Sequence, residues 1–257
     1  SYSPNGIIGE KDACGVGFVA NVEGIESNWI LKQSLKGLNC MEHRGGCGGD
    51  SDSGDGAGIL CSIPWGYLDE ELNLINKQKL DRGLGMVFMP NKKEKIEECK
   101  SICEEEAEKL SVKETSWRKV PVNNEILGPL AKANVPYICQ WILYIDTKDN
   151  QNIEKLLFQL RKRIEKKIRE TFKNDVGDCE FYFASLSSQT VVYKGMVRSE
   201  ILSEFYQDLK KENFKVSFSV YHRRFSTNTL PKWPLAQPMR FLGHNGEINT
   251  LLGNINW

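Results

Sequence analysis

The stretch Asp12-Ala13-Cys14-Gly15-Val16-Gly17-Phe18-Val19 places a cysteine directly before a short apolar run. The small and β-branched residues of this run predict a buried strand over 14–20. A cysteine in such a strand is usually an inert core residue, because free cysteine is among the most buried residue types. The alternative is that Cys14 is a nucleophile and that the remaining sequence places chemical groups around it.

Composition restricts the class of protein. The 257 residues are 40% hydrophobic and 26% charged, with a formal net charge of zero. These values are typical of a soluble globular protein of one large or two ordinary domains, and they argue against a general nucleic-acid binder. No run approaches the ~18 apolar residues of a membrane span. The first eleven residues lack a basic region and a long apolar core, so they are not a secretory signal.

The eight cysteines predict thiols rather than a disulfide framework. Their spacing is irregular, the chain is large and no secretory signal precedes them. Cys99 and Cys103 lie four residues apart on a predicted charged helix, but no second pair completes a zinc or iron–sulfur site. We therefore expect a reduced compartment and no metal in this segment.

Strand-like and helix-like patterns follow one another along the chain and predict a mixed α+β core. Strands are predicted over 14–20, 59–63, 83–89, 117–122, 137–145, 181–186, 190–193 and 216–221. Helices are predicted over 29–41, 92–110, 152–172 and 199–209. The helix over 152–172 has the clearest apolar period, and its other face carries Arg161, Lys162, Arg163, Lys166, Lys167 and Arg169. We interpret this basic face as solvated, because net charge is zero and no aromatic residues are interleaved.

A glycine-rich segment over 42–58 predicts a long loop rather than a regular element. It lacks the Gly-Lys-Ser/Thr sequence of a phosphate-binding loop. Asp50, Asp52 and Asp55 suggest a calcium loop, but Gly54 comes one position early and Cys61 stands where the twelfth position requires Glu. The segment is therefore neither of these sites.

What remains is a thiol, two arginines in polar turns and the pair Asn245-Gly246. Asn-Gly usually marks a turn, and loop arginines usually lie at the surface. Together, however, they suit a thiol that attacks an amide: an Asn side chain and a neighbouring backbone N–H can stabilise the oxyanion, and an arginine can clamp a carboxylate. His43, His222 and His244 leave a Cys–His pair open, but no signature specifies one.

These residues resemble the class II glutamine amidotransferase domain of the N-terminal-nucleophile hydrolases, and more narrowly the amino-terminal domain of glutamate synthases. The resemblance runs from Asp12 to Trp257. Its motifs are Cys14-Gly15-Val16-Gly17-Phe18, Glu42-His43-Arg44-Gly45-Gly46, Gly54-Asp55-Gly56, 187–196, 221–229, 233–240 and 243–250. The stretches 40–48 and 63–65 look most like the ferredoxin-dependent branch of plastids and cyanobacteria. The implied fold is an α+β, four-layer αββα sandwich.

The resemblance also implies roles for individual residues. Cys14 matches the nucleophile, and the Asn245 side chain and the Gly246 backbone N–H match the oxyanion hole. Arg224 matches the arginine that binds the α-carboxylate, and Thr227 matches a residue of the same substrate-binding turn. Arg44 matches an arginine near the nucleophile whose role is more structural. The aspartate that holds the substrate α-amino group lies beyond Trp257. In this family the base is the α-amino group of the nucleophile itself. We therefore expect residues 1–13 to be a propeptide and 14–257 to be an amidotransferase domain, incomplete at its carboxyl end.

The partners and cofactors follow from the same resemblance. L-glutamine is the expected substrate, and a synthase domain of the same longer chain would use its ammonia to make glutamate from 2-oxoglutarate. Ferredoxin is favoured over NAD(P)H as electron donor. FMN and a 3Fe-4S cluster, with FAD as an open addition, are expected in that synthase region and none in this segment. The expected location is the plastid stroma, with a cyanobacterial-type cytoplasm as alternative.

Two other interpretations are weighed against this one. The first is another amidotransferase of the same class, which makes an amino sugar or a purine precursor; the matching stretch 58–221 argues against it. The second is a non-catalytic regulatory or binding domain of the same fold, in which Cys14 is never unmasked.

Overall fold

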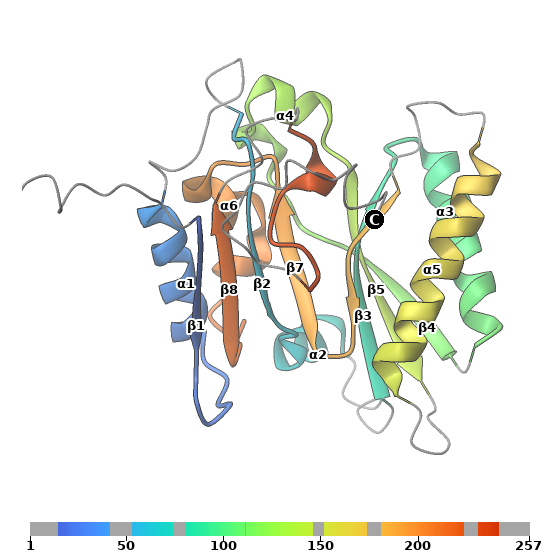
Figure 1. Cartoon of the computed structure of the whole chain (residues 1–257), viewed down its shortest axis with the longest axis horizontal. Helices are drawn as coiled ribbons and strands as arrows, with labels where there is room; N and C mark the ends of the chain where they lie inside the picture. Colours follow the sequence, from blue (N-terminus) through green and yellow to red (C-terminus); the bar gives the residue numbers. More distant parts are fainter. Residues whose placement is uncertain are drawn as a thin grey trace, which may run out of the picture.

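The structure is a computed structural model, and it describes residues 15–41, 53–73, 81–110, 112–145, 152–173, 181–223 and 231–241. These residues form two antiparallel four-stranded sheets with helices packed around them. Figure 1 shows helix α1, the first sheet, the second sheet and the pair α3 and α5 in that order across the molecule. The expected α+β sandwich is confirmed.

The element bounds agree with most of the predicted ranges. The strands are β1 (Val16–Ala20), β2 (Ala57–Ser62), β3 (Asp81–Met89), β4 (Val112–Lys119), β5 (Tyr137–Ile145), β6 (Tyr182–Ser187), β7 (Thr190–Gly195) and β8 (Phe218–Arg223). The α-helices are α1 (Asn28–Cys40), α2 (Trp65–Leu72), α3 (Lys93–Glu108), α4 (Pro129–Ala133), α5 (Ile153–Thr171) and α6 (Leu202–Phe205). Short 3-10 turns are η4 (Asn124–Ile126), η5 (Ser199–Ile201), η6 (Gln207–Lys210) and η7 (Trp233–Leu235).

The first sheet has the strand order β1-β8-β2-β7. Its pairing places Val16 opposite His222, and Ala57 opposite both Arg223 and Gly195. The amino-terminal ends of β1 and β2 therefore meet the carboxyl-terminal ends of β7 and β8. We call the place where these strand ends meet the Ala57 end of the first sheet.

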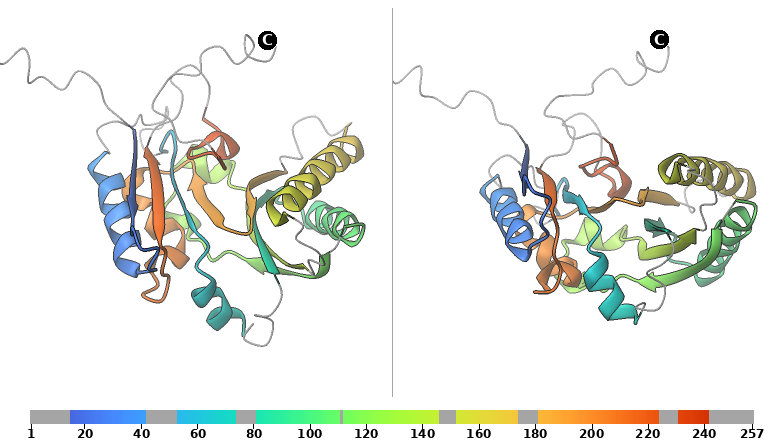
Figure 2. Two further views of the ribbon diagram at one scale, coloured as in Figure 1. Left: turned by 60° about the horizontal axis from the view of Figure 1, so that its bottom comes forward. Right: turned by 90° about the horizontal axis from the view of Figure 1, so that it is seen from below.

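The second sheet has the order β4-β5-β3-β6, and α3 and α5 cover one of its faces side by side (Figure 2). Its central strands β3 and β5 are buried on both faces along most of their length. Their near-continuous apolar sequences are what a strand needs when neither face meets water. Trp141 of β5 stacks on Trp117 of β4 at a centroid distance of 5.2 Å within the layer under these helices.

A buried polar network joins the two sheets. Arg118 of β4 donates two hydrogen bonds of 2.8 Å to the carboxylate of Asp208, which also accepts from the hydroxyls of Tyr67 and Tyr193 at 2.8 and 3.0 Å. Gln140 of β5 donates to the Tyr193 hydroxyl at 2.9 Å. Burial and then the Asp208 charge raise the pKa values of both tyrosines, so their hydroxyls stay protonated donors. Residues from both sheets thus supply hydrogen-bond partners to the buried ion pair between Arg118 and Asp208.

Several elements differ from their predictions, among them the short helix α4, which was not predicted. Helix α2 was not predicted; it begins directly after Pro64 and ends after two turns at Asn73, whose φ is 54°, so it is too short to show a clear period. Strand β4 begins at Val112 rather than at 117, because it lies at a sheet edge where charged side chains are tolerated. The helix predicted over 199–209 is divided into η5, α6 and η6.

The division of that helix has a tertiary cause. Tyr206 has an extended backbone and pairs with Val122 of a distant segment. Two backbone hydrogen bonds accompany this pairing, from Asn123 N–H to Phe205 C=O at 2.9 Å and from Gln207 N–H to Pro121 C=O at 3.1 Å. These contacts replace the helical bonds that the local pattern predicts.

The basic face predicted for α5 needs one correction. Arg161 is only 5% exposed; it lies over the Phe158 ring and donates to Glu165 at 2.7 Å. Its long alkyl stem allows burial against the helix while the guanidinium keeps an ion-pair partner. Lys162 and Lys166, in contrast, are largely exposed, as expected of a solvated face.

Candidate active site

The residues singled out from the sequence, Cys14, Arg44, Arg224, Thr227, Asn245 and Gly246, all lie outside the described residues. The structure does place the residues next to them in the chain. Gly15 follows Cys14, Arg223 precedes Arg224, and the segment 53–56 follows the loop that contains Arg44. These neighbours come together at the Ala57 end of the first sheet.

The contact between Gly15 and Arg223 is a direct one. The backbone N–H of Arg223 donates to the carbonyl of Gly15 at 2.6 Å, and this bond continues the pairing of β1 with β8. Arg223 is also the pairing partner of Ala57 at the start of β2. Three segments that are distant in sequence therefore end at one point, directly beside the two positions expected to hold the nucleophile and the substrate carboxylate.

Arg223 is a functional candidate that the sequence interpretation missed. Its side chain is fully buried and donates to the carboxylate of Asp55 and, at 3.1 Å, to the carbonyl of Gly56. A buried arginine that is paired in this way fixes the end of the glycine-rich loop against β8. The available signal was the Gly54-Asp55-Gly56 motif, because a lone acidic residue between two glycines suggests a structural ion-pair partner.

The two glycines beside Asp55 are required by their surroundings. A Cβ atom on Gly54 would lie 2.3 Å from the backbone carbonyl carbon of Val197. Gly56 has a φ of +144°, which side-chain-bearing residues rarely adopt, and it packs against Ala236. The exit of the loop is thus held tightly on both sides of Asp55.

A second segment, 231–241, also covers this part of the first sheet and leads in the chain toward Asn245-Gly246. Trp233 is buried against Gly195, where a Cβ would come within 2.3 Å of the indole ring, and its ring nitrogen donates to the Ala131 carbonyl at 3.2 Å. A Cβ on Gly58 would lie 2.7 Å from the carbonyl oxygen of Gln237. Small residues on β2 and β7 thus allow the segment to lie directly on the sheet.

The described cysteines are poor candidates for a nucleophile. Cys40, Cys61, Cys99, Cys103 and Cys139 are present as thiols, and all but Cys40 are buried. Burial raises the pKa of Cys139 to about 12 and raises those of Cys61 and Cys103 further above their usual range. Because the thiolate is the reactive form, these buried thiols are inert.

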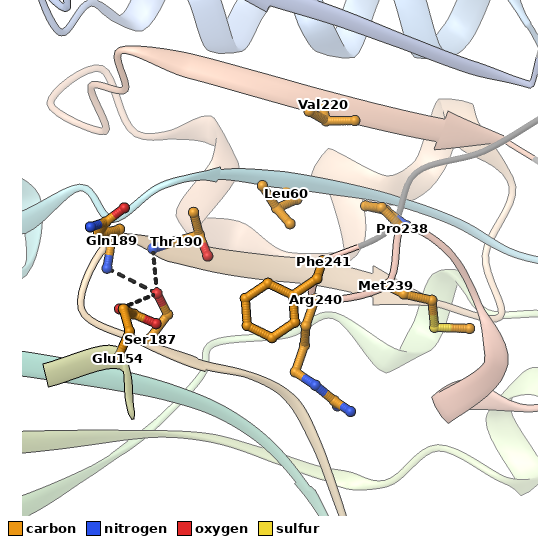
Figure 3. Close-up of a pocket in the computed structure, with 10 residues that line it drawn as sticks. All are labelled: Leu60, Glu154, Ser187, Gln189, Thr190, Val220, Pro238, Met239, Arg240 and Phe241. Atoms are coloured by element: carbon orange, nitrogen blue, oxygen red, sulfur yellow. Dashed lines mark hydrogen bonds between the residues drawn. The ribbon is translucent and has the colours of Figure 1, made fainter. Parts of the chain in front are cut away.

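A cavity of about 400 Å³ lies between the β6–β7 corner and the segment 238–241, and Figure 3 shows the residues that line it. Its walls are Leu60, Glu154, Ser187, Gln189, Thr190, Val220, Pro238, Met239, Arg240 and Phe241. Glu154 is occupied within this wall, since it accepts from the Ser187 hydroxyl at 2.9 Å and from the Ser188 N–H at 2.6 Å. The polar groups here close the corner of the sandwich rather than converge on a ligand.

The described part of the chain lacks two other kinds of feature. It contains no group of three or more His, Cys, Asp or Glu residues that could hold a metal ion. None of its helices is long and apolar enough to cross a membrane. His222 is buried on β8, while His43 and His244 lie outside the described ranges.

Comparisons with known proteins point in one direction. Residues 14–257 match the family model of the class-II glutamine amidotransferases. The chain is 49% identical over 255 residues to the chloroplastic/mitochondrial ferredoxin-dependent glutamate synthase 1 of Arabidopsis thaliana. It is 50% identical over 257 residues to ferredoxin-dependent glutamate synthase 2 of a Synechocystis strain. Both alignments cover 98% of this chain but only 16% of the relative.

Proposed function

The chain belongs to the class II glutamine amidotransferases, and on that premise we propose that it releases ammonia from L-glutamine with Cys14 as nucleophile. The observation that carries the proposal is the contact between Gly15 and Arg223. Paired Cα atoms in antiparallel strands lie about 5.5 Å apart, and consecutive Cα atoms of one chain lie about 3.8 Å apart. The Cα atoms of Cys14 and Arg224 therefore cannot be more than about 13 Å apart. This is a suitable span for a glutamine whose amide meets the thiolate while its α-carboxylate meets the guanidinium.

The proposed mechanism is acyl transfer. The α-amino group of Cys14, with a reference pKa near ~8, takes the thiol proton, and the thiolate attacks the side-chain amide carbon of glutamine. The Asn245 side chain and the Gly246 N–H stabilise the oxyanion. Ammonia leaves with the transferred proton, a glutamyl thioester forms, and water hydrolyses it to glutamate. We assign Thr227, by resemblance, to substrate binding together with Arg224, and Arg44 to a more structural role.

Cleavage of the Ala13–Cys14 bond is part of the proposal. While residues 1–13 remain attached, Cys14 carries an amide nitrogen that cannot serve as a base. The family match, which starts at residue 14, supports a domain that begins at the nucleophile. Amino-terminal sequencing of the active protein should begin at Cys14, and an active species that begins at Ser1 would contradict the cleavage step.

The fate of the ammonia is proposed from the relatives. They are named ferredoxin-dependent glutamate synthases, and this chain spans 16% of their length. We expect a synthase region of the same longer protein to convert 2-oxoglutarate to glutamate with electrons from ferredoxin. FMN and a 3Fe-4S cluster would belong to that region. The chloroplastic names of plant relatives favour the plastid stroma, which organelle fractionation of source cells would test.

The experiment that tests the function separates the two half-reactions. In the full-length protein, Cys14→Ala should abolish glutamine-dependent glutamate formation and spare the ammonia-dependent reaction. Labelling with the glutamine analogue diazo-oxo-norleucine, followed by mass spectrometry, should modify Cys14. The alternative of a non-catalytic domain predicts no labelling, and loss of both half-reactions in Cys14→Ala would contradict the division into two domains.

A further inference from the structure

Lys194 of β7 is fully buried, and its amino group contacts three atoms of neighbouring segments. It donates to the carbonyl of Pro234 at 2.8 Å and to the hydroxyl of Tyr182 at 3.2 Å, and it lies 3.7 Å from the sulfur of Met239. Two of these partners, Pro234 and Met239, belong to the segment 231–241. The side chain thus connects a central strand to the chain that covers it.

This burial of a cationic side chain is costly. Among the described residues no carboxylate forms an ion pair with Lys194. Burial, and then the charge of the nearby Arg240, lower the pKa of Lys194 to about 7. A methionine would fill the same volume without this penalty, so fold stability alone does not explain a lysine at this position.

The contacts of Lys194 are made where the segment is most closely fitted to the sheet. Gly58, directly opposite Lys194 in the pairing of β2 with β7, leaves room for the Gln237 carbonyl, and Gly195 leaves room for Trp233. Arg240 continues the attachment, since it donates to the Phe183 carbonyl and lies over the Tyr182 ring. Lys194 supplies the hydrogen bonds at the centre of this contact.

We propose that Lys194 is a positioning residue: its amino group fixes the segment 231–241 on β7 and thereby sets the place of Asn245 and Gly246. Asn245 follows Met239 by six positions in the chain. The inference rests on the proposed function, in which these two residues form the oxyanion hole. Lys194 touches neither substrate nor reacting atoms in this scheme.

A positioning role has a kinetic signature that a purely structural role lacks. Oxyanion donors act on the transition state, whereas the α-carboxylate of glutamine is held by Arg224 on another segment. Displacement of the donors should therefore lower kcat and leave KM nearly unchanged. A shift of about 1 Å in a catalytic group costs on the order of 10- to 100-fold in rate.

The test measures glutamine hydrolysis by the full-length protein in three variants. Lys194→Met removes the amine at equal volume and should lower kcat by about 10- to 100-fold with KM within about threefold. Lys194→Gln keeps an N–H that can donate to the Pro234 carbonyl, so its kcat should lie above that of Lys194→Met. Val191→Ala, a buried change on the opposite face of the same strand, should lower the melting temperature without lowering kcat.

The outcomes separate this inference from the function beneath it. If the unaltered protein neither hydrolyses glutamine nor is labelled at Cys14, the proposed function fails. If it does both, a Lys194→Met protein with unchanged kcat overturns the inference, as does an equal loss of kcat in Val191→Ala. If Lys194→Met does not fold, Lys194→Gln decides: a lowered kcat at constant KM supports positioning, and unchanged kinetics reject it.

Discussion

The central strands of the second sheet and the edge strand β1 of the first sheet differ in how completely they are enclosed. Strands β3 and β5 of the second sheet are buried on both faces, under α3 and α5 on one side and against the common core on the other. Strand β1 of the first sheet leaves Phe18 75% exposed. Two of the residues expected to bear the chemistry adjoin the first sheet, since Cys14 comes shortly before β1 and Arg224 directly follows β8. The comparison indicates that the enclosed central strands supply stability, while β1 lies next to residues to which the proposed function assigns the chemistry.

The largest expected effect contrasts two cysteines, one beside each sheet. Cys14→Ala should lower glutaminase activity at least about 1000-fold, since no other group replaces a nucleophile. Cys139→Ala in the second sheet should leave kcat unchanged and cost about 1 kcal/mol of stability through a small cavity. Steady-state assays of glutamine hydrolysis and thermal unfolding check both. Equal loss of activity in the two variants would remove the functional distinction between the sheets.

The next effect tests how firmly the sheets are joined. Asp208→Ala removes the two hydrogen bonds of Arg118, which is only 6% exposed, to a buried carboxylate and leaves only the more distant Glu71 at 3.8 Å. The change should cost about 3–5 kcal/mol of unfolding free energy. The matched control is Lys32→Ala, which breaks the exposed pair with Glu212 and should cost less than about 1 kcal/mol. Urea denaturation measures both. A cost near that of the control would mean that the network does not connect the sheets energetically.

A third effect, smaller per pH unit, concerns the pH dependence of stability. The pKa of Lys194 is about 7 in the folded protein, whereas the ordinary pKa of a lysine, which applies to the unfolded chain, is 10.5. Between pH 7 and pH 10.5 the unfolded chain therefore binds more protons than the folded protein. Stability of the unaltered protein should therefore gain up to about 1.4 kcal/mol per pH unit from about pH 7 to 10.5 relative to Lys194→Met. The charged or titratable neighbours on the packed elements are Arg240, Tyr182 and, through Tyr182, Arg161 and Glu165.

Denaturation curves of both proteins at several pH values provide the measurement. The difference between them should be constant below pH 7 and should shrink above it. Parallel curves across the whole range would show that Lys194 carries no buried-charge penalty, and its amine would then be solvated or paired.

The smallest effect tests the open face itself. Phe18→Ala should change the unfolding free energy by less than about 0.5 kcal/mol, because most of this side chain already meets solvent. Phe183→Ala on β6 removes a fully buried ring and should cost about 3–5 kcal/mol. Thermal unfolding compares them. A similar cost at both positions would mean that another part of the protein covers Phe18.

The local sequence pattern correctly predicted those elements whose tertiary contacts favour the same secondary structure. The strand over 137–145 has the bounds of β5, and the helix over 152–172 differs from α5 by one residue at each end. In α5 the burial follows the apolar period of the sequence, and in β5 a near-continuous apolar run is buried along almost its whole length. The prediction of one helix over 199–209 was wrong because Tyr206 pairs with Val122. The start of β4 was predicted too late because this edge strand carries charged residues. Such pairings are not visible in a local window.

The sequence by itself determined the class of fold and the family, and it predicted Cys14 as the nucleophile, because these rest on residue types in a fixed order along the chain. Only the tertiary structure decided that Gly15, Arg223 and Ala57 meet at one end of the first sheet. It also selected Arg223 as the buried partner of Asp55 and Lys194 as the anchor of the segment 231–241. The physical reason is that burial and hydrogen-bond partners depend on strand pairing between distant segments, whereas periodicity and motifs depend only on near neighbours.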